Sequence, residues 1–164
     1  MNEVLLDPIR HNTWATRQLL AFCRDAGLTD EQLTTPGVGT FGGILPTLNH
    51  VISSDASYLD ALLDRERTAS TDTDLAGLAS RAEELEGLWE QLLSDPVDVE
   101  RVIVVDDGAN EVHAGVFLAQ ALNHANIHRE QVCAMLTGLG IKAPDVQAWE
   151  YAWATGRLWE RTAD

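Results

Sequence analysis

Residues 41–63, FGGILPTLNHVISSDASYLDALL, carry the clearest helical pattern in the chain. Apolar side chains recur there every three or four residues, the spacing that places them on one face of an α-helix. These apolar residues are Phe41, Ile44, Leu45, Leu48, Ile52, Leu59, Leu62 and Leu63. The pattern predicts a long amphipathic helix from about Thr40 to Arg67, with Pro46 in its first turns, where a missing N–H is tolerated.

Three more segments show helical spacing, and residues that break helices separate them. The first runs from about Asp7 to Gly27, with Pro8 at an early helical position. The next runs from about Asp72 to Leu93 and is ended by Ser-Asp-Pro. The last runs from about Ala114 to Gly138. The chain is therefore expected to form four long helices.

The links between these helices contain turn-forming residues. Residues 29–40, TDEQLTTPGVGT, are expected to form a loop. Residues 99–113, VERVIVVDDGANEVH, place β-branched residues on both sides of Asp-Asp-Gly, which predicts a small β-hairpin. A shorter, Trp-rich helix is expected from Asp145. The predicted fold class is all-α: a four-helix bundle with a small β-hairpin before the last long helix and a short C-terminal helix.

Length and composition limit the classes of protein to consider. At 164 residues the chain is expected to form a single domain over residues 1–164. Its net charge of -15 repels polyphosphate, so nucleic acid is not an expected partner. No apolar run reaches the roughly 20 residues that span a membrane, and no signal-peptide pattern is present, so the protein is expected to be cytoplasmic. Cys23 and Cys133 are expected to be reduced core residues.

Two histidines of the last long helix are spaced to bind one ion. His124 and His128 are four residues apart, so they lie about 40° apart around the helix and about 6 Å apart along it. The apolar face of this helix runs through and beside them. Its members are Phe117, Ala121, Ala125, Val132, Met135, Leu136 and Leu139. The spacing alone also fits two surface or core histidines, but because burying two imidazoles without partners is costly, a shared metal ion is the expected partner.

His50, in the second long helix, is a third candidate ligand. It lies nearly opposite the apolar stripe of its helix, beside a row of small and mildly polar residues. That position suits a residue facing a pocket and equally one facing solvent, and the sequence leaves both open. His113 would be about 16 Å from His124 and is expected to be a hairpin or cap residue. Nothing in the sequence fixes His11 near the others.

The chain resembles the DinB-like (damage-inducible) metalloenzyme family, which consists of four-helix-bundle proteins with a three-histidine site. The matching elements are HNTWATRQLL (11–20), FGGILPTLNHVISSDASYL (41–59), ALNHANIHREQVCAMLTGLG (121–140) and WEYAWATGR (149–157). The resemblance implies that His50, His124 and His128 are the metal ligands. The chain departs from many relatives at Glu130, where they have Gly, and at Ile127, where they have a polar residue instead.

The resemblance also implies an activity. Related proteins act as S-transferases or isomerases that use a low-molecular-weight thiol, such as bacillithiol or mycothiol. The expected cofactor is one divalent transition metal, zinc or nickel before iron, and the expected partners are a thiol and a small electrophile. Metal-dependent hydrolysis and a non-catalytic, stress-associated metal-binding role remain alternatives. The sequence singles out no catalytic acid or base.

Polar residues that flank the predicted ligands are candidates for orienting them or for binding substrate, or they are ordinary surface residues. They are Asn49, Tyr58, Arg129 and Gln131. Asp55 is expected to be an inter-helix partner and not a ligand. Trp149, Trp153 and Trp159 lie within the last sixteen residues. A homodimer would cover such apolar surface, and so would packing across the end of the bundle.

Overall fold

The structure, a computed structural model, describes residues 3–66 and 74–161. Within these ranges the chain forms four long helices, two short helices and one two-stranded sheet. The long helices are α1 (Glu3–Asp25), α3 (Ile44–Leu62), α4 (Leu75–Ser94) and α5 (Ala114–Gly138). The short helices are α2 (Asp30–Thr34) and α6 (Ala148–Ala154). The predicted fold class is confirmed.

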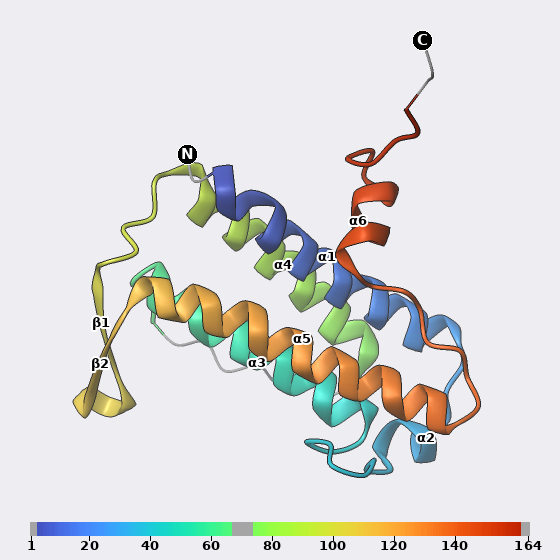
Figure 1. The fold of residues 1–164 in the computed structure, drawn as a ribbon. Helices are drawn as coiled ribbons and strands as arrows, with labels where there is room; N and C mark the ends of the chain where they lie inside the picture. The colour runs from blue at the N-terminus through green and yellow to red at the C-terminus, as the bar shows by residue number, and fades with distance from the viewer. Residues whose placement is uncertain (1–2, 67–73, 162–164) are drawn as a thin grey trace.

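Each long helix packs against two others. α1 and α3 lie diagonally across the bundle, and each contacts both α4 and α5 (Figure 1). The centre is filled by large apolar side chains that are almost completely buried. They include Ile9, Leu19, Leu20, Ile44, Leu48, Leu59, Leu78, Leu85, Trp89, Leu93 and Leu136. Because α3 and α5 are neighbours, residues on their facing sides come together although they are far apart in sequence.

The predicted hairpin is confirmed. β1 (Val102–Val105) pairs antiparallel with β2 (Asn110–His113), and a 3₁₀ turn over Asp106–Gly108 joins them. Asp106 and Asp107 both have φ of 53°, in the left-handed region that aspartate tolerates better than most residues. The hairpin lies at the end of the bundle where α3 ends and α5 begins (Figure 1).

Several predicted boundaries were wrong. Helix α1 begins at Glu3, so Pro8 lies inside the helix and not near its start. The expected loop 29–40 contains α2, which was missed because it has only five residues. A capping box stabilises this short helix: the side chain of Thr29 accepts from the backbone N–H of Gln32, and the side chain of Gln32 accepts from the N–H of Thr29.

Helix α3 begins at Ile44 and ends at Leu62, so it is shorter than predicted. The chain passes beside α2 just before it, and a Cβ on Gly43 would lie 2.5 Å from the carbonyl carbon of Thr34. This close approach places the turn into α3 at Gly43. Phe41 is therefore a loop residue and not part of the apolar stripe. The predicted start of the next helix, Asp72, lies outside the described residues.

The C-terminal helix α6 packs on α1 through Tyr151, whose ring contacts His11 and Trp14. It begins at Ala148, three residues after the predicted Asp145. Trp149, Trp153 and Trp159 are 73%, 53% and 74% exposed, so they do not pack across the end of the bundle. None of the helices in the described residues combines the length and the apolar character needed to cross a membrane.

Candidate metal centre

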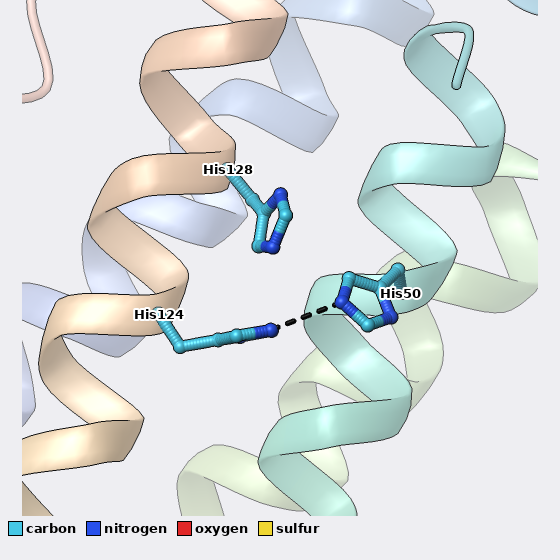
Figure 2. A group of neighbouring side chains, drawn as sticks. All are labelled: His50, His124 and His128. Atoms are coloured by element: carbon cyan, nitrogen blue, oxygen red, sulfur yellow. Dashed lines mark hydrogen bonds between the residues drawn. The ribbon is translucent and has the colours of Figure 1, made fainter. Parts of the chain in front are cut away.

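His50, His124 and His128 converge between α3 and α5. Figure 2 shows the ring of His50 projecting from α3 toward the two rings of α5. One ligand nitrogen from each residue can be chosen so that all three lie within 4.8 Å of one another. The Nε2 atoms of His50 and His124 are 3.0 Å apart. The pocket-facing alternative for His50 is thus the one that the structure shows.

The spacing suits a small divalent cation. Zinc lies about 2.0–2.1 Å from imidazole nitrogen, so two nitrogens in a tetrahedral site are separated by roughly 3.3 Å. The 3.0 Å between His50 and His124 is close to that value. Three imidazole nitrogen donors without a fourth protein ligand among the described residues also match sites that keep a position open for water or substrate. The residues present therefore fit a bound divalent metal.

Local electrostatics keep two of the rings neutral. Burial, followed by the nearby His128 and His50, lowers the pKa of His124 to about 4. Burial and His128 also lower the pKa of His50. A neutral imidazole presents the lone pair that a metal needs, so at pH 7 these two residues do not have to lose a proton to bind one.

Gln131 fixes the orientation of His128. Its Oε1 lies 2.7 Å from Nδ1 of His128, so Nδ1–H donates to it and Nε2 carries the free lone pair. The other ring nitrogen of His128 faces His50 and His124 (Figure 2). The amide of Gln131 also reaches the loop before α3: it accepts from the N–H of Phe41 and donates to the carbonyl of Gly39, both at 3.4 Å.

Aromatic rings border the three histidines on two sides. Phe41 stacks on His50 with ring centroids 4.0 Å apart and planes at 9°, although the residue is 55% exposed. The ring of Tyr58 is edge-on to His124 at 6.0 Å. Sequence reasoning missed the contribution of Phe41 because an apolar residue at helical spacing reads as core. The Gly-Gly that follows it was the available signal that the helix begins later.

Arg129 and Asp55 point into the core, away from the three rings. The guanidinium of Arg129 donates from one nitrogen to the carbonyl and Oδ1 of Asn12 and to Oγ1 of Thr16, and burial lowers its pKa to about 10. Asp55 accepts from Nε1 of Trp89 at 2.9 Å. Asp55 is thus the inter-helix partner that the sequence predicted, while Arg129 ties α5 to α1.

The remaining flanking residues lie outside the centre. Asn49 accepts from the hydroxyl of Ser53 at 3.0 Å. His11 has its Nε2 2.8 Å from the carbonyl oxygen of Val146. His113 ends β2 and precedes α5, with Nδ1 2.9 Å from the carbonyl oxygen of Glu100, which agrees with the expected hairpin or cap role. In the described part of the chain, the group that can hold an ion contains three histidines and no carboxylate.

A family model described as the DinB family matches residues 1–162, which is nearly the whole chain. Comparison with curated proteins gives no match.

Proposed function

The chain belongs to the DinB family, and from that premise we propose that His50, His124 and His128 bind one divalent transition metal and that the protein uses it to activate a low-molecular-weight thiol. Zinc or nickel is the expected ion, before iron. The thiol, of the mycothiol or bacillithiol kind, is transferred to a small electrophile or takes part in an isomerisation. The observation that carries the proposal is the convergence of three histidine nitrogens within 4.8 Å.

His50, His124 and His128 would hold the cation, which when bound would lower the pKa of a thiol and so supply thiolate at neutral pH. In the transfer, the thiol S–H bond breaks and its proton passes to solvent. The sulfur then forms a bond to a carbon of the electrophile, and that carbon's bond to the leaving group breaks with its electron pair. The chain's own part is to hold the three imidazoles in place and, through burial, to keep His50 and His124 neutral.

Gln131 and the bordering aromatic rings support this arrangement. Gln131 holds His128 in the tautomer whose Nε2 lone pair is free, and its contacts with Gly39 and Phe41 tie the loop before α3 to the same site. Phe41 and Tyr58 cover part of the rings with apolar surface. Contact of the centre with water is therefore reduced at these two rings, which strengthens electrostatic interactions there.

Hydrolysis is less well supported than thiol transfer. Attack by bound hydroxide is assisted by a general base within hydrogen-bond reach of the attacking water. In the described residues, no aspartate or glutamate belongs to the group around the three histidines. Asp55 lies on the core side of α3, where it accepts a hydrogen bond from Trp89. A thiol needs less help than water, because its ordinary pKa is already near 8.5.

The test is to incubate the metal-loaded protein with a panel of electrophiles, with and without thiols, beside the His124→Ala variant. Metal-dependent consumption that requires the thiol and is lost in the variant supports transfer. Consumption without any thiol indicates hydrolysis. Inertness of the loaded protein across the panel indicates a non-catalytic, metal-binding role.

We also propose a cytoplasmic location and a homodimer. Cys23 and Cys133 are free thiols, and burial raises the pKa of the Cys23 thiol to about 12. Unoxidised cysteines are usual in a reducing compartment. The exposed tryptophans of α6 and the chain after it form an apolar surface that a second copy would cover.

A further inference from the structure

A cleft of about 470 Å³ lies beside the candidate metal centre. Residues of α3, the hairpin turn and the start of α5 line it. Tyr58 is common to both sites, because its ring is 6.0 Å from the ring of His124 and 5.6 Å from that of Phe117, which also lines the cleft. Gln120 donates to the Tyr58 hydroxyl at 3.5 Å. The cleft and the metal centre are thus neighbouring parts of the α3–α5 face.

The distance between the two parts sets the size of a molecule that would occupy both. Phe117 precedes His124 by seven residues on α5, which corresponds to about 10 Å along the helix axis. A thiol with its sulfur at the histidines needs a tail of roughly that length to reach the cleft. Cysteine is too short for this, whereas thiols of tripeptide size are long enough.

The charges in the cleft determine which tails it accepts. Among the described residues that line it, the only cationic side chain is Arg65, and its Nε lies 3.6 Å from Oδ1 of Asp60. The hairpin turn adds the carboxylates of Asp106 and Asp107. Three acidic residues therefore line the cleft: Asp60 is buried and paired with Arg65, and the exposed Asp106 and Asp107 have no described cationic lining residue left to balance them. Arg129, the nearest cation in sequence to the ligands, donates to α1. A carboxylate in this cleft would meet repulsion without a free cation to receive it.

The lining also offers groups that favour a different tail. The exposed Asp106 and Asp107 carry carboxylate oxygens that can accept hydrogen bonds from hydroxyl and amine groups. Tyr58 and Phe117 present aromatic surface against which the carbon skeleton of a tail, or an ammonium group, can pack.

We propose that this cleft binds the tail of the thiol cosubstrate and selects tails that carry hydroxyl or amine groups and no carboxylate. The proposal rests on the thiol chemistry of the proposed function and adds the class of thiol. It predicts that the protein binds thiols of equal length with different affinity according to whether their tails carry carboxylates.

Glutathione and its diethyl ester form a matched pair of probes, because they share sulfur, length and amine and differ in two carboxylates. Each is titrated into the full chain loaded with cobalt(II), and the visible absorption of the cobalt reports thiol binding. At low salt we expect the diester to bind at least about fivefold more tightly than glutathione, with the difference shrinking as salt is added.

The Asp106→Asn/Asp107→Asn double variant tests whether the cleft causes the discrimination. Asparagine tolerates the positive φ of both positions, so the turn is retained. We expect the ratio of the two affinities to fall at least about threefold, mainly through tighter binding of glutathione. The control Asp30→Asn/Glu31→Gln removes the same charge from α2, which does not line the cleft, and should keep the wild-type ratio.

The outcomes separate the two proposals. Equal binding of both probes by the wild type, or a preference for the diester that the double variant and the control retain equally, would overturn the assignment of the cleft while leaving thiol activation intact. If neither probe changes the absorption of bound cobalt, thiol activation itself fails, and the cleft proposal fails with it.

Discussion

At the level of single residues, the three histidines differ in how they are held. Their rings are nearly equidistant, since the centroids are 4.8 Å apart for His50 and His124, 4.8 Å for His50 and His128, and 4.5 Å for His124 and His128. We expect the parent protein to contain about one equivalent of metal and His124→Ala to contain little, because two ligands rarely hold a divalent ion firmly. Elemental analysis of untagged protein measures this. His113→Ala, which alters a histidine outside the centre, should keep its metal, and equal metal in all three proteins would refute the site.

Gln131 provides a second prediction at the same scale. Removing the acceptor of the His128 Nδ1–H frees the ring to rotate and to change tautomer. We expect Gln131→Ala to weaken metal binding by about 10-fold or more, as is usual when the hydrogen-bond partner of a ligand is lost. Gln131→Glu keeps that acceptor and should bind metal nearly as well as the parent. Competition with a chelator of known affinity measures the metal affinity of each variant. Equal weakening in the two variants would count against the role of Gln131 as the acceptor that orients His128.

At the level of helices and strands, the spacing of apolar residues predicted the long helices and missed the short α2. The bounds of α5 agreed with the expected Ala114 and Gly138, because a sustained apolar face and a terminal Gly-Leu-Gly define both ends. The five-residue α2 was missed, since its stability comes from a capping box and not from a repeating face. The start of α3 was misplaced because the close contact of Gly43 with α2 is tertiary information that no local pattern contains.

The site, like the fold, could be predicted only in part from the sequence. The four-residue spacing of His124 and His128 and the resemblance to the family were enough to nominate all three histidines. Which way His50 faces depended on α5 covering that side of α3, and this is a property of the assembled bundle. Phe41 could not be found, because its contact with His50 follows from the path of a loop.

The contact between α2 and α3 gives a prediction for stability. Gly43→Ala would place a Cβ 2.5 Å from the Thr34 carbonyl carbon, and backbone must move to relieve it. We expect a loss of about 1–3 kcal/mol in the free energy of unfolding. Gly87→Ala is the matched control, because Gly87 is at an exposed position inside α4 and nothing lies within 4 Å of its added Cβ; it should stabilise by up to about 1 kcal/mol. Urea denaturation of the metal-free proteins compares them, and a neutral Gly43→Ala would contradict the packing.

Asp55, which joins α3 to α4, should make stability depend on pH. Burial raises its pKa from 3.8 to about 6, above the value in the unfolded chain. The folded state therefore binds more protons between these values, and this contribution to stability is present below about pH 4 and lost as pH rises to about 6. The loss is on the order of 3 kcal/mol. The pKa values of His50 and His124 are lowered, so these residues make the free energy of unfolding rise with pH. The effect of Asp55 is therefore isolated by comparing the parent with a variant that lacks this carboxyl.

Asp55→Asn removes the titration while keeping an acceptor for the Nε1–H of Trp89. The free energy of unfolding of the parent, measured relative to that of the variant, should fall between pH 4.5 and 7. Denaturant curves for the metal-free proteins at those pH values give this difference. A difference that stays constant across the range would show that Asp55 has an ordinary pKa.

At the level of the whole molecule, the tryptophan surface leads to a prediction about assembly. Trp149, Trp153 and Trp159 are more than half exposed on a short helix and the chain that follows it. We expect light scattering after size exclusion to give about twice the 18.0 kDa chain mass at micromolar concentration. Replacing Trp149 and Trp153 by serine should shift the protein to a monomer with its metal retained. A parent protein that elutes as a monomer would remove the dimer.

The ligands His50 and His124 are 74 positions apart in the sequence, and the chain between them includes α4 and the hairpin. An ion bound to both would act as a reversible cross-link that closes this long loop, much as a disulfide does, and would reduce the entropy of the unfolded chain for as long as it stays attached. Loss of the ion under metal starvation would then remove a staple as well as a cofactor. The depleted chain should open more readily and be degraded first, so that the amount of protein in the cell would follow the supply of its metal.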